Sequence, residues 1–543
     1  MGWLLSISTI ILPNGWNEIP QLLFFTVGGL LTTLVFYRLY FHPLAEYPGP
    51  LLARCTSLHA AYHAWIGDSH LVLYHAHRKY GKFVRFTPNC ISVNDAVAVN
   101  EIYGNGRNVQ KSSFYSVMPP YPHATDIHSV IDKALHGRKR RVMAQAFLET
   151  AIKGMEDTVL THIRTFVRSL GTDSCENENP GIGESNASRN MVYRSIWLTF
   201  DVTGDLSFGK SFDMLTREEW RFWPTLIDRA IHRHAIAGIS IKIHKLGLGN
   251  YLFPAIAEGQ KTFIKYSKEQ AKERVALGAG VRKDFFHYLL NAKDPQTGEG
   301  YSMSELWGES NVLIVAGSHT PSVALAATFF FLANYPKVLA ELTTLVRTTF
   351  SDCEEIRSEK FSTPECQPAY KLVRACLDEA MRMAPPIPTT LLRQVLKGGI
   401  TIAGKYFPEG VDIATPCFTL HMNEEYYPDP FTYNPKRFLA DKAESLEAFQ
   451  RARNAFAPFS IGPRNCIGRS LAYLELTLTL ARTVWMYDFV YVGGGRETRL
   501  DNIAFVEKLG GNKNPILYRF DDHFTAFVSR EGPKIKFIRR GDF

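Results

Sequence analysis

The fold of this chain is decided by the stretch Phe459-Ser460-Ile461-Gly462-Pro463-Arg464-Asn465-Cys466-Ile467-Gly468. It presents one cysteine, Cys466, in a tight loop that runs directly into the apolar, helix-prone segment 469–476. Gly462 and Gly468 supply backbone freedom and close approach on either side of the thiol, and the proline between them stiffens the turn. The sequence therefore predicts a cysteine presented at the start of a helix.

The residue types in this loop suit a metal ligand. Arg464 places a cation two residues from the thiol, and a cysteine at the start of a helix is biased toward the thiolate. No second cysteine lies nearby, and Phe459 adds a flat aromatic ring. A single soft axial bond from Cys466 to a haem iron fits these features. The alternative is that Cys466 is a small buried hydrophobic residue, as lone cysteines usually are.

The ten residues resemble the haem-binding loop of the cytochromes P450, whose pattern Phe-x-x-Gly-x-Arg-x-Cys-x-Gly they match at all five specified positions. The resemblance extends from Arg38 to the carboxyl end and is to the microsomal, fungal type. It implies the P450 fold, which is mainly α with small β-sheets (α+β) in a single large haem domain. It also implies haem b as the cofactor, with the thiolate of Cys466 as axial ligand and Phe459, Gly462, Gly468 and Arg464 around it.

Size and composition allow a large enzyme. The 543 residues, 45% of them hydrophobic, can bury a large core. A net charge of +8 is modest for this length, which argues against a nucleic-acid binder and favours a membrane surface or an acidic protein as partner. The eight cysteines are scattered without zinc-ligand spacing, as expected of reduced thiols in a cytosolic environment.

An apolar segment near the amino terminus predicts a membrane anchor. Nineteen uncharged residues lie between Glu18 and Arg38, and at about 1.5 Å per residue they nearly span a hydrocarbon core of about 30 Å. A cleaved signal peptide or a buried core helix is the alternative. The first basic residues follow the segment, which leaves the rest of the chain in the cytosol. We expect a single-pass protein of the endoplasmic reticulum with an anchor (1–40), a proline-rich hinge (41–50) and a catalytic domain (51–543).

Other parts of the chain give weaker signals. Residues 51–130 suggest a small sheet, around the runs 83–86 and 91–93, followed by irregular loops. By resemblance, the loop 114–123 covers a pocket and the turn in 522–527 projects into the substrate cavity. The apolar and cationic stretch 220–254 reads either as an element on the membrane surface or as a buried helix pair.

A run of basic residues opens a predicted helix at His136. By default such a run is a solvated helix face. By resemblance, His136 and Arg140 instead reach a haem propionate. The remaining cations would then steer an acidic electron-donating flavoprotein toward the domain; they are Arg138, Lys139, Arg141, Arg451 and Arg453.

One segment offers a rival function. Residues 204–211 match the phosphate-binding pattern Gly-x-x-x-x-Gly-Lys-Ser literally. A phosphate cradle needs a preceding strand and small residues whose amides converge, whereas this loop carries Leu206 and Phe208. A P-loop nucleotide-binding protein is therefore the alternative of another class, and a catalytically silent haem protein is a further one.

A long helix is predicted from the capping box Ser302-Met303-Ser304-Glu305 to Asn334. Pro321 has no amide hydrogen and collides with the carbonyl of Gly317, so the helix should open there. This Gly-lined opening beside Thr320 resembles the groove in which the family holds dioxygen over the iron.

The residue before Thr320 departs from the family pattern. Asp or Glu is usual there, whereas this chain has His319. A histidine can still move protons near neutral pH, or it can point away as a packing residue. The substitution leaves the usual proton relay open, and with it the choice between hydroxylation and a desaturating or rearranging reaction.

Two further groups of charged residues follow from the resemblance. Glu379 and Arg382, three apart on one helix face, would form a buried structural cluster with Arg437. Arg393 and Arg464 would be two further propionate anchors.

The resemblance implies a membrane-anchored monooxygenase. It would insert one oxygen atom of O2 into an apolar small molecule, with electrons from NADPH through cytochrome P450 reductase and with cytochrome b5 as a further candidate partner. Fungal terpenoids or polyketides are the expected substrates.

Overall fold

The computed structural model describes residues 19–119, 125–171, 188–239, 241, 254–278, 280, 282–494, 516–528 and 531–541. The end of the predicted loop 114–123 and most of the stretch between 240 and 253 lie outside these residues.

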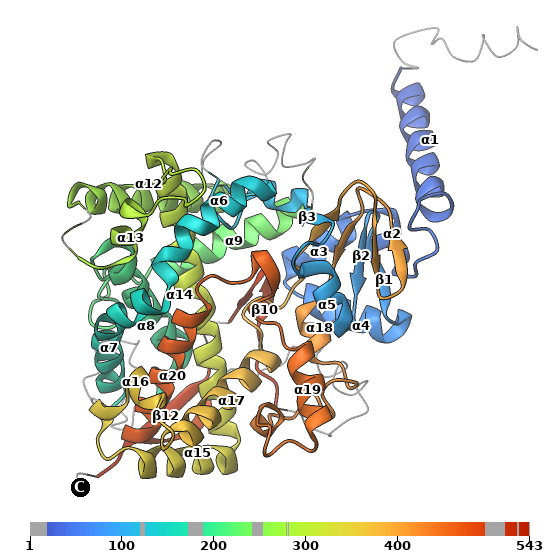
Figure 1. Cartoon of the computed structure of the whole chain (residues 1–543). Coiled ribbons are helices and arrows are strands. Elements are labelled where there is room, and N and C mark those ends of the chain that lie inside the picture. Colours follow the sequence, from blue (N-terminus) through green and yellow to red (C-terminus); the bar gives the residue numbers. More distant parts are fainter. Residues whose placement is uncertain are drawn as a thin grey trace, which may run out of the picture.

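The described chain is mainly helical, as predicted (Figure 1). The α-helices are α1 (Ile19–Tyr40), α2 (Leu51–Cys55), α3 (Leu58–Ile66), α4 (Ser69–Tyr80), α5 (Ala96–Tyr103), α6 (Lys133–Ala144), α7 (Glu149–Gly171), α8 (Met191–Phe208), α9 (Trp223–Ile239), α12 (Pro254–Ala276), α13 (Phe285–Asn291), α14 (Met303–Asn334), α15 (Pro336–Thr349), α16 (Ser358–Phe361), α17 (Gln367–Met383), α18 (Cys417–His421), α19 (Leu446–Ala455) and α20 (Arg469–Met486). Short 3-10 helices are η1 (Ser113–Val117), η2 (Gln145–Phe147), η3 (Cys353–Glu355), η4 (Pro435–Phe438) and η5 (Gly462–Arg464).

The strands form small sheets. The largest has the order β1-β2-β8-β5-β3, from β1 (Phe83–Thr87), β2 (Cys90–Val93), β8 (Asp412–Ala414), β5 (Arg393–Val395) and β3 (Val109–Lys111). A second is β4 (Arg189–Asn190), β12 (Lys534–Arg539) and β9 (Tyr487–Gly493), and the hairpins are β6 (Ile400–Ile402) with β7 (Lys405–Phe407) and β10 (Asp521–His523) with β11 (Thr525–Phe527). The predicted runs 83–86 and 91–93 are β1 and β2, whereas the four helices α2 to α5 were not foreseen.

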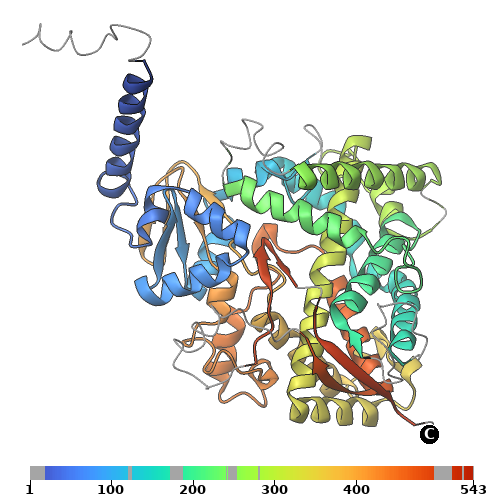
Figure 2. The ribbon, with the colours of Figure 1, turned by 180° about the vertical axis from the view of Figure 1, so that it is seen from behind.

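Helix α14 is the central element of the helical part (Figures 1 and 2). Its capping box is confirmed, because the Ser302 hydroxyl accepts from the Glu305 amide and the Glu305 carboxylate accepts from the Ser302 amide. The helix packs against α8, α12, α17 and α20. Thr199 on α8 also donates to the carbonyl of Ser318 at 2.6 Å, which ties the two helices together at the middle of α14.

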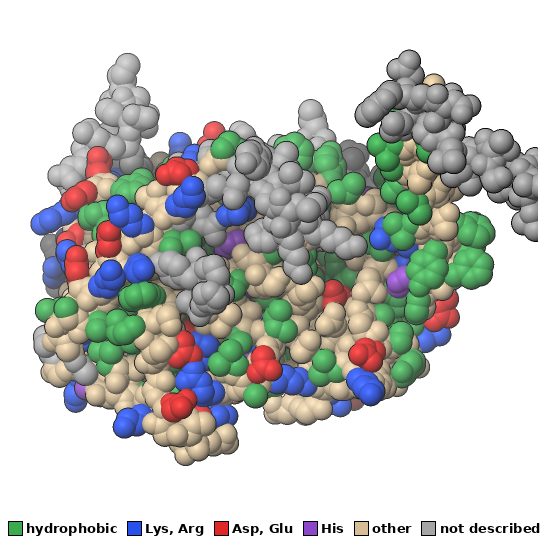
Figure 3. All heavy atoms as spheres, turned by 90° about the horizontal axis from the view of Figure 1, so that it is seen from above, with side chains coloured by type: hydrophobic (Ala, Val, Ile, Leu, Met, Phe, Trp, Pro, Cys, Tyr) green, Lys and Arg blue, Asp and Glu red, His purple; other side chains and the backbone are tan. Residues whose placement is uncertain are grey.

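Helix α1 extends away from the body (Figure 1), and it is long and apolar enough to cross a membrane. α14 passes the same test by composition, but it is mostly buried in the protein. Exposed hydrophobic side chains continue from α1 onto α2 and α3, on the side of the molecule where α1 emerges (Figure 3), at Phe41, Leu51, Leu52, Leu58, Tyr62 and Trp65.

The segment that follows α1 is packed against the body. Leu44 and Tyr47 are buried, and the guanidinium of Arg85 on β1 donates to the carbonyls of Arg38 and Leu44. Arg54 donates to the carbonyl of Ala45 at 3.0 Å. These hydrogen bonds fix the carboxyl-terminal end of α1, and the segment that follows it, against the body of the protein.

Candidate functional site

The cysteine loop has an unusual backbone that holds Cys466 at the head of α20. The Cys466 amide donates to the carbonyl of Phe459 at 2.8 Å, which closes the loop. Gly462 has φ +69°, and a Cβ there would lie 2.0 Å from the carbonyl oxygen of Tyr103. Ser460 has φ +54°, a strained conformation of the kind that gathers at functional sites. Only glycine at 462 lets the loop pass this close to Tyr103.

Cys466 keeps accessible surface at the head of α20, yet the protein around the thiol raises its pKa above the ordinary value by desolvation. The amide of Gly468 and the charges of Arg140 and Arg469 oppose this shift. In the protein alone, desolvation therefore outweighs the helix start and the nearby cations, which favour the thiolate. A bound metal ion would still deprotonate a coordinating thiol.

Four basic residues lie close enough to His136 on α6 to act on its charge: Lys111 on β3, Arg140 on α6, Arg393 on β5 and Arg464 in η5. Arg464 donates to the carbonyls of Val130 and Ile131, and Arg140 donates to Asn465 next to the cysteine. Within the described residues, none of the four forms an ion pair with a carboxylate.

Because these four cations form no ion pairs among the described residues, their cluster is a suitable site for an anion. The charges of Arg393 and Arg464, after burial itself, depress the pKa of Lys111 well below its ordinary value. Burial and the same cations lower the pKa of His136 to about 3, so this imidazole is neutral at physiological pH. Buried charge without a counterion is costly. A flat group with two carboxylates, as haem is, would balance the cluster and reach the thiol, so the residues fit this cofactor.

Lys111 is the member of the cluster that sequence reasoning missed. It donates to the carbonyl of His128 and lies over the ring of Tyr115, with its Nζ 4.4 Å from the ring centroid. A single lysine in a short strand carries no motif that would have revealed this position.

Three other cations of the basic run form ion pairs within the protein, whereas the sequence led us to expect that they are free to face a partner. Arg138 pairs with Glu305, and Arg141 pairs with Asp294 at 2.6 Å. Lys139 is buried and lies 3.2 Å from Glu309. These carboxylates belong to α14 and to the turn before it, so the three cations hold α6 against the long helix. Their partners lie more than 150 positions away in the sequence, and the run alone could not show them.

The middle of α14 carries the predicted oxygen-site residues. The Thr320 hydroxyl donates to the carbonyl of Ala316 at 2.9 Å. A Cβ at Gly317 would lie 2.9 Å from the side chain of Thr203, so this glycine permits the close crossing of α8. The helix remains α-helical through Pro321, and the expected opening is limited to the amide hydrogen bond that proline cannot make.

His319 points toward α9 and contacts a carboxylate there. Its Nε2 lies 3.1 Å from Oδ1 of Asp228, and its side chain is only 5% exposed. His319 is thus neither a solvent-facing nor a purely apolar packing residue. The pair joins residues 91 positions apart, so no local pattern could predict it.

Glu379 and Arg382 form a buried pair on α17, and Arg437 approaches it. Nε of Arg382 lies 2.7 Å from Oε2 of Glu379, and both side chains are completely buried. Nε of Arg437 lies 3.5 Å from Oε1 of Glu379, while the amide of Asn434 donates to the same oxygen. The structure therefore brings together the three charges that the sequence pattern grouped.

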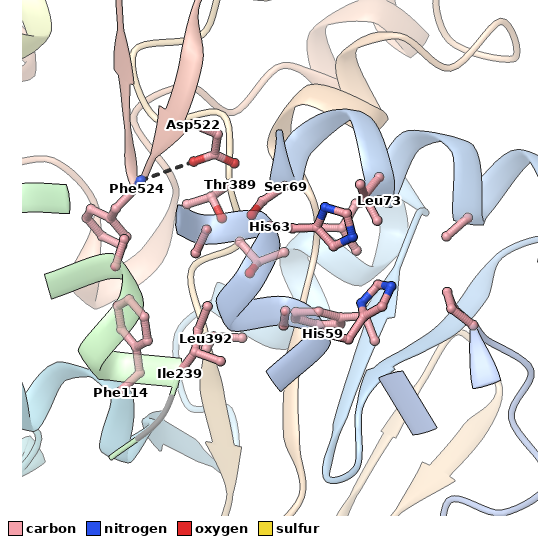
Figure 4. Close-up of a pocket in the computed structure, with 18 residues that line it drawn as sticks. His59, His63, Ser69, Leu73, Phe114, Ile239, Thr389, Leu392, Asp522 and Phe524 are labelled. Carbon is pink, nitrogen blue, oxygen red and sulfur yellow. Dashed lines mark hydrogen bonds between the residues drawn. The ribbon is translucent and has the colours of Figure 1, made fainter. Parts of the chain in front are cut away.

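An apolar cavity lies between α3, α4, α9, the segment 389–392 and the β10–β11 hairpin (Figure 4). Phe114 and Phe524 stack at its wall with ring centroids 5.7 Å apart. Phe524 has φ +78°, and its amide donates to Asp522. As expected, the turn of this hairpin projects into a cavity, and the extended segment after the prolines runs along it.

The rival phosphate-binding reading is incompatible with the structure. Residues 204–208 are the last turn of α8, and Gly209, with φ +69°, ends the helix. A phosphate loop follows a strand and begins a helix, whereas this segment ends one. Gly204 instead makes room for the ring of Phe212.

The comparisons with known proteins now decide the family. The family model described as cytochrome P450 matches residues 53–511. The chain belongs to the cytochrome P450 family. It is 37% identical over 508 residues to cytochrome P450 monooxygenase atnE of Emericella nidulans, with 93% of each chain covered. It is 37% identical to poxM of Penicillium oxalicum, covering 85% of this chain and 87% of that one. It is 34% identical to apf7 of Gibberella fujikuroi, covering 95% and 97%.

Membership of this family implies which cofactor and partners the site serves. A P450 monooxygenase carries a haem-thiolate cofactor, receives electrons from a redox partner and acts on a small molecule. The accessible thiol of Cys466 and the cluster of basic residues around His136 are the features of this P450 that suit such a cofactor. Its amino-terminal apolar helix is consistent with a membrane anchor, as in fungal microsomal members.

Proposed function

We propose that this P450 is anchored in the endoplasmic reticulum membrane by the segment up to residue 40, with its catalytic domain in the cytosol. It oxidises an apolar small molecule of fungal secondary metabolism, a terpenoid or a polyketide. NADPH-cytochrome P450 reductase supplies the electrons, with cytochrome b5 as an additional donor. The observation that carries the proposal is the accessible thiol of Cys466 together with the four basic residues around His136, none of which forms an ion pair with a carboxylate in the described part of the chain.

In this proposal the cofactor would be haem b. Cys466 would bind its iron, and Phe459, Gly462 and Gly468 would shape the loop that presents the thiol. His136, Arg140, Arg393 and Arg464 would hold the propionates, and Lys111 would add a fourth cation to the cluster. When bound, the cofactor supplies the activation of dioxygen for transfer of one oxygen atom.

The protein's own residues bind substrate and move protons. The aromatic wall of the cavity, with Phe114 and Phe524, orients an apolar molecule and excludes water. Thr320, on the same turn as Gly317, presents a hydroxyl at the oxygen site. Its proton is donated to the Ala316 carbonyl, which leaves its oxygen lone pairs available to accept a hydrogen bond. His319, one residue away, is the titratable group of this turn.

Spectral binding and isotope labelling test the proposal. Membranes that contain the haem protein and the reductase are screened with terpenoid and polyketide precursors for compounds that perturb the haem spectrum. A compound that binds is then turned over with NADPH under ¹⁸O2, and we expect one labelled oxygen atom in the product. A product without label would favour the desaturating or rearranging alternative, and no binding by any apolar compound would contradict the substrate class.

A further inference from the structure

One face of α9 contacts three functional parts of the domain in turn. The residues of this face, spaced at helical intervals, are Asp228, His232, Ala235 and Ile239. Asp228 contacts His319 on α14, and His232 stacks on His523 of β10 with ring centroids 3.8 Å apart. Ala235 and Ile239 line the apolar cavity of Figure 4. Helix α9 thus links the substrate cavity to the residue beside Thr320.

The contact between His319 and Asp228 leaves one ring nitrogen without a partner. Nε2 of His319 lies 3.1 Å from the carboxylate, whereas its Nδ1 is buried with no hydrogen-bond partner. A buried polar atom without a partner is rare and costs free energy. Either a water molecule or a movement of the ring is needed to satisfy it.

A second cavity, of about 70 Å³, lies at this pair on the α9 side of α14. His319 and Asp228 line it together with Ser322 and with residues of α8 and β11. A cavity holds a water molecule once it offers roughly 10–15 Å³ to a water-sized sphere and a few polar partners. The cavity therefore has room for several waters beside the unpartnered nitrogen.

Helix α14 separates this cavity from the oxygen site. Ala316 and Thr320 lie on one face, and both keep accessible surface in the middle of a buried helix. The cavity is lined by the neighbouring face of the same two turns, through His319, Ser322, Val323 and Ala326. His319 is the titratable residue of this part of α14 that borders the cavity and is adjacent in sequence to Thr320.

We propose that Asp228 is a positioning residue for proton supply: it holds the imidazole of His319 between the water-sized cavity and the turn that carries Thr320. This inference rests on the proposed function and adds to it a residue of α9. Where the family pattern has one carboxylate on α14, this P450 divides the task between a histidine on α14 and a carboxylate on α9.

The reaction consumes protons, and in this proposal His319 and Asp228 deliver them. Each turnover joins one oxygen atom of O2 to the substrate and releases the other as water, with consumption of two electrons and two protons. The electrons come from the redox partner and the protons from solvent. The imidazole of His319 passes a proton toward Thr320 and regains one from water in the cavity, while the Asp228 carboxylate, 3.1 Å from its Nε2, holds the ring in place. The other titratable or charged groups around the pair are Arg221, His232, Tyr193 and His523.

The test compares Asp228→Asn with a matched variant in the haem-loaded enzyme. Asp205 contacts His162 at 2.7 Å and is 16% exposed, as Asp228 is, but that pair joins α7 to α8 away from the cavity. Haem content, NADPH oxidation and hydrogen peroxide release are measured with reductase and dioxygen. We expect normal haem content in Asp228→Asn, and the hydrogen peroxide released per NADPH oxidised should rise severalfold, because an imidazole that is no longer held by the carboxylate delivers protons less effectively. Asp205→Asn should keep the wild-type ratio of peroxide to NADPH.

A double variant shows whether the effect passes through His319. If Asp228 acts by positioning, Asp228→Asn should change nothing further in a His319→Asn background. An unchanged ratio of hydrogen peroxide to NADPH in Asp228→Asn, an equal rise in Asp205→Asn, or a full additional rise in the double variant would overturn the proposal. If Asp228→Asn loses haem, the single variant His319→Asn becomes the test, and a wild-type ratio in that variant would exclude the relay. Failure of the wild-type protein to bind haem would instead reject the proposed function.

Discussion

Arg382 donates two hydrogen bonds to Glu379, at 2.7 Å and 2.9 Å, and both side chains are completely buried on α17. Removing one partner would leave a charge in the core without compensation. We expect Glu379→Ala to lower the free energy of unfolding by about 3–5 kcal/mol. Lys442 and Glu341 form an exposed pair at 2.6 Å, and Lys442→Ala should cost at most about 1 kcal/mol. Denaturant unfolding of both variants checks the contrast, and equal losses would contradict it.

Gly462 permits the cysteine loop to pass Tyr103. Alanine at 462 would meet the Tyr103 carbonyl oxygen at 2.0 Å and would also be strained at φ +69°. We expect Gly462→Ala to lose most of its haem. Gly404 has a similar φ of +79° with open space around it, so Gly404→Ala should pay only the backbone strain of about 1–2 kcal/mol and keep its haem. The measurement is the haem content per protein in the two variants. A haem-loaded Gly462→Ala would show that the close approach to Tyr103 does not constrain the loop.

Lys111 should act in opposite directions on the haem-free and the haem-bound protein. Its buried cation destabilises the protein when no anion balances it, so Lys111→Met should unfold at a higher temperature than the wild type without haem. The same change removes a charge-assisted contact worth about 1.5–3 kcal/mol, so haem should dissociate at least about tenfold faster. Exposed Lys133 provides the control, and equal behaviour of Lys111→Met and Lys133→Met would remove Lys111 from the cluster.

Glu475 on α20 should make stability depend on pH. Burial raises the pKa of its carboxyl from 4.5 to about 8, and Oε1 has no hydrogen-bond partner. The folded protein therefore binds this proton more tightly than the unfolded chain, and stability falls as the pH rises from about 4.5 to about 8, by at most about 1.4 kcal/mol per pH unit. Glu475→Gln should flatten this slope. Melting temperatures from pH 4.5 to 8 measure it, and an unchanged slope would show that Glu475 does not titrate in this range.

The local motifs could be predicted from the sequence because their signal lies in adjacent residues. The turn residues around Cys466 and the capping box at Ser302 act through the backbone within a few positions. The charged contacts could not be predicted in the same way. Arg138 and Lys139 read as a surface run because their partners on α14 lie far along the chain. The pairing of His319 with Asp228 depends on how α9 crosses α14, which no short pattern records.

The helices between residues 51 and 80 were missed for a related reason. α3 and α4 are rich in histidine, tyrosine and alanine, and their apolar faces are short. Their helical form depends on packing against the sheet and α9 more than on a strong local periodicity.

The central claim is that the sulfur of Cys466 is the axial ligand of a haem iron, and the absorption spectrum of the reduced, carbon monoxide-bound protein tests it most directly. Cys353, on the short helix η3, provides a matched control. We predict the Soret band of a thiolate-ligated complex in the wild type and in Cys353→Ser, and its loss in Cys466→Ser. An unchanged band and unchanged turnover in Cys466→Ser would contradict the account.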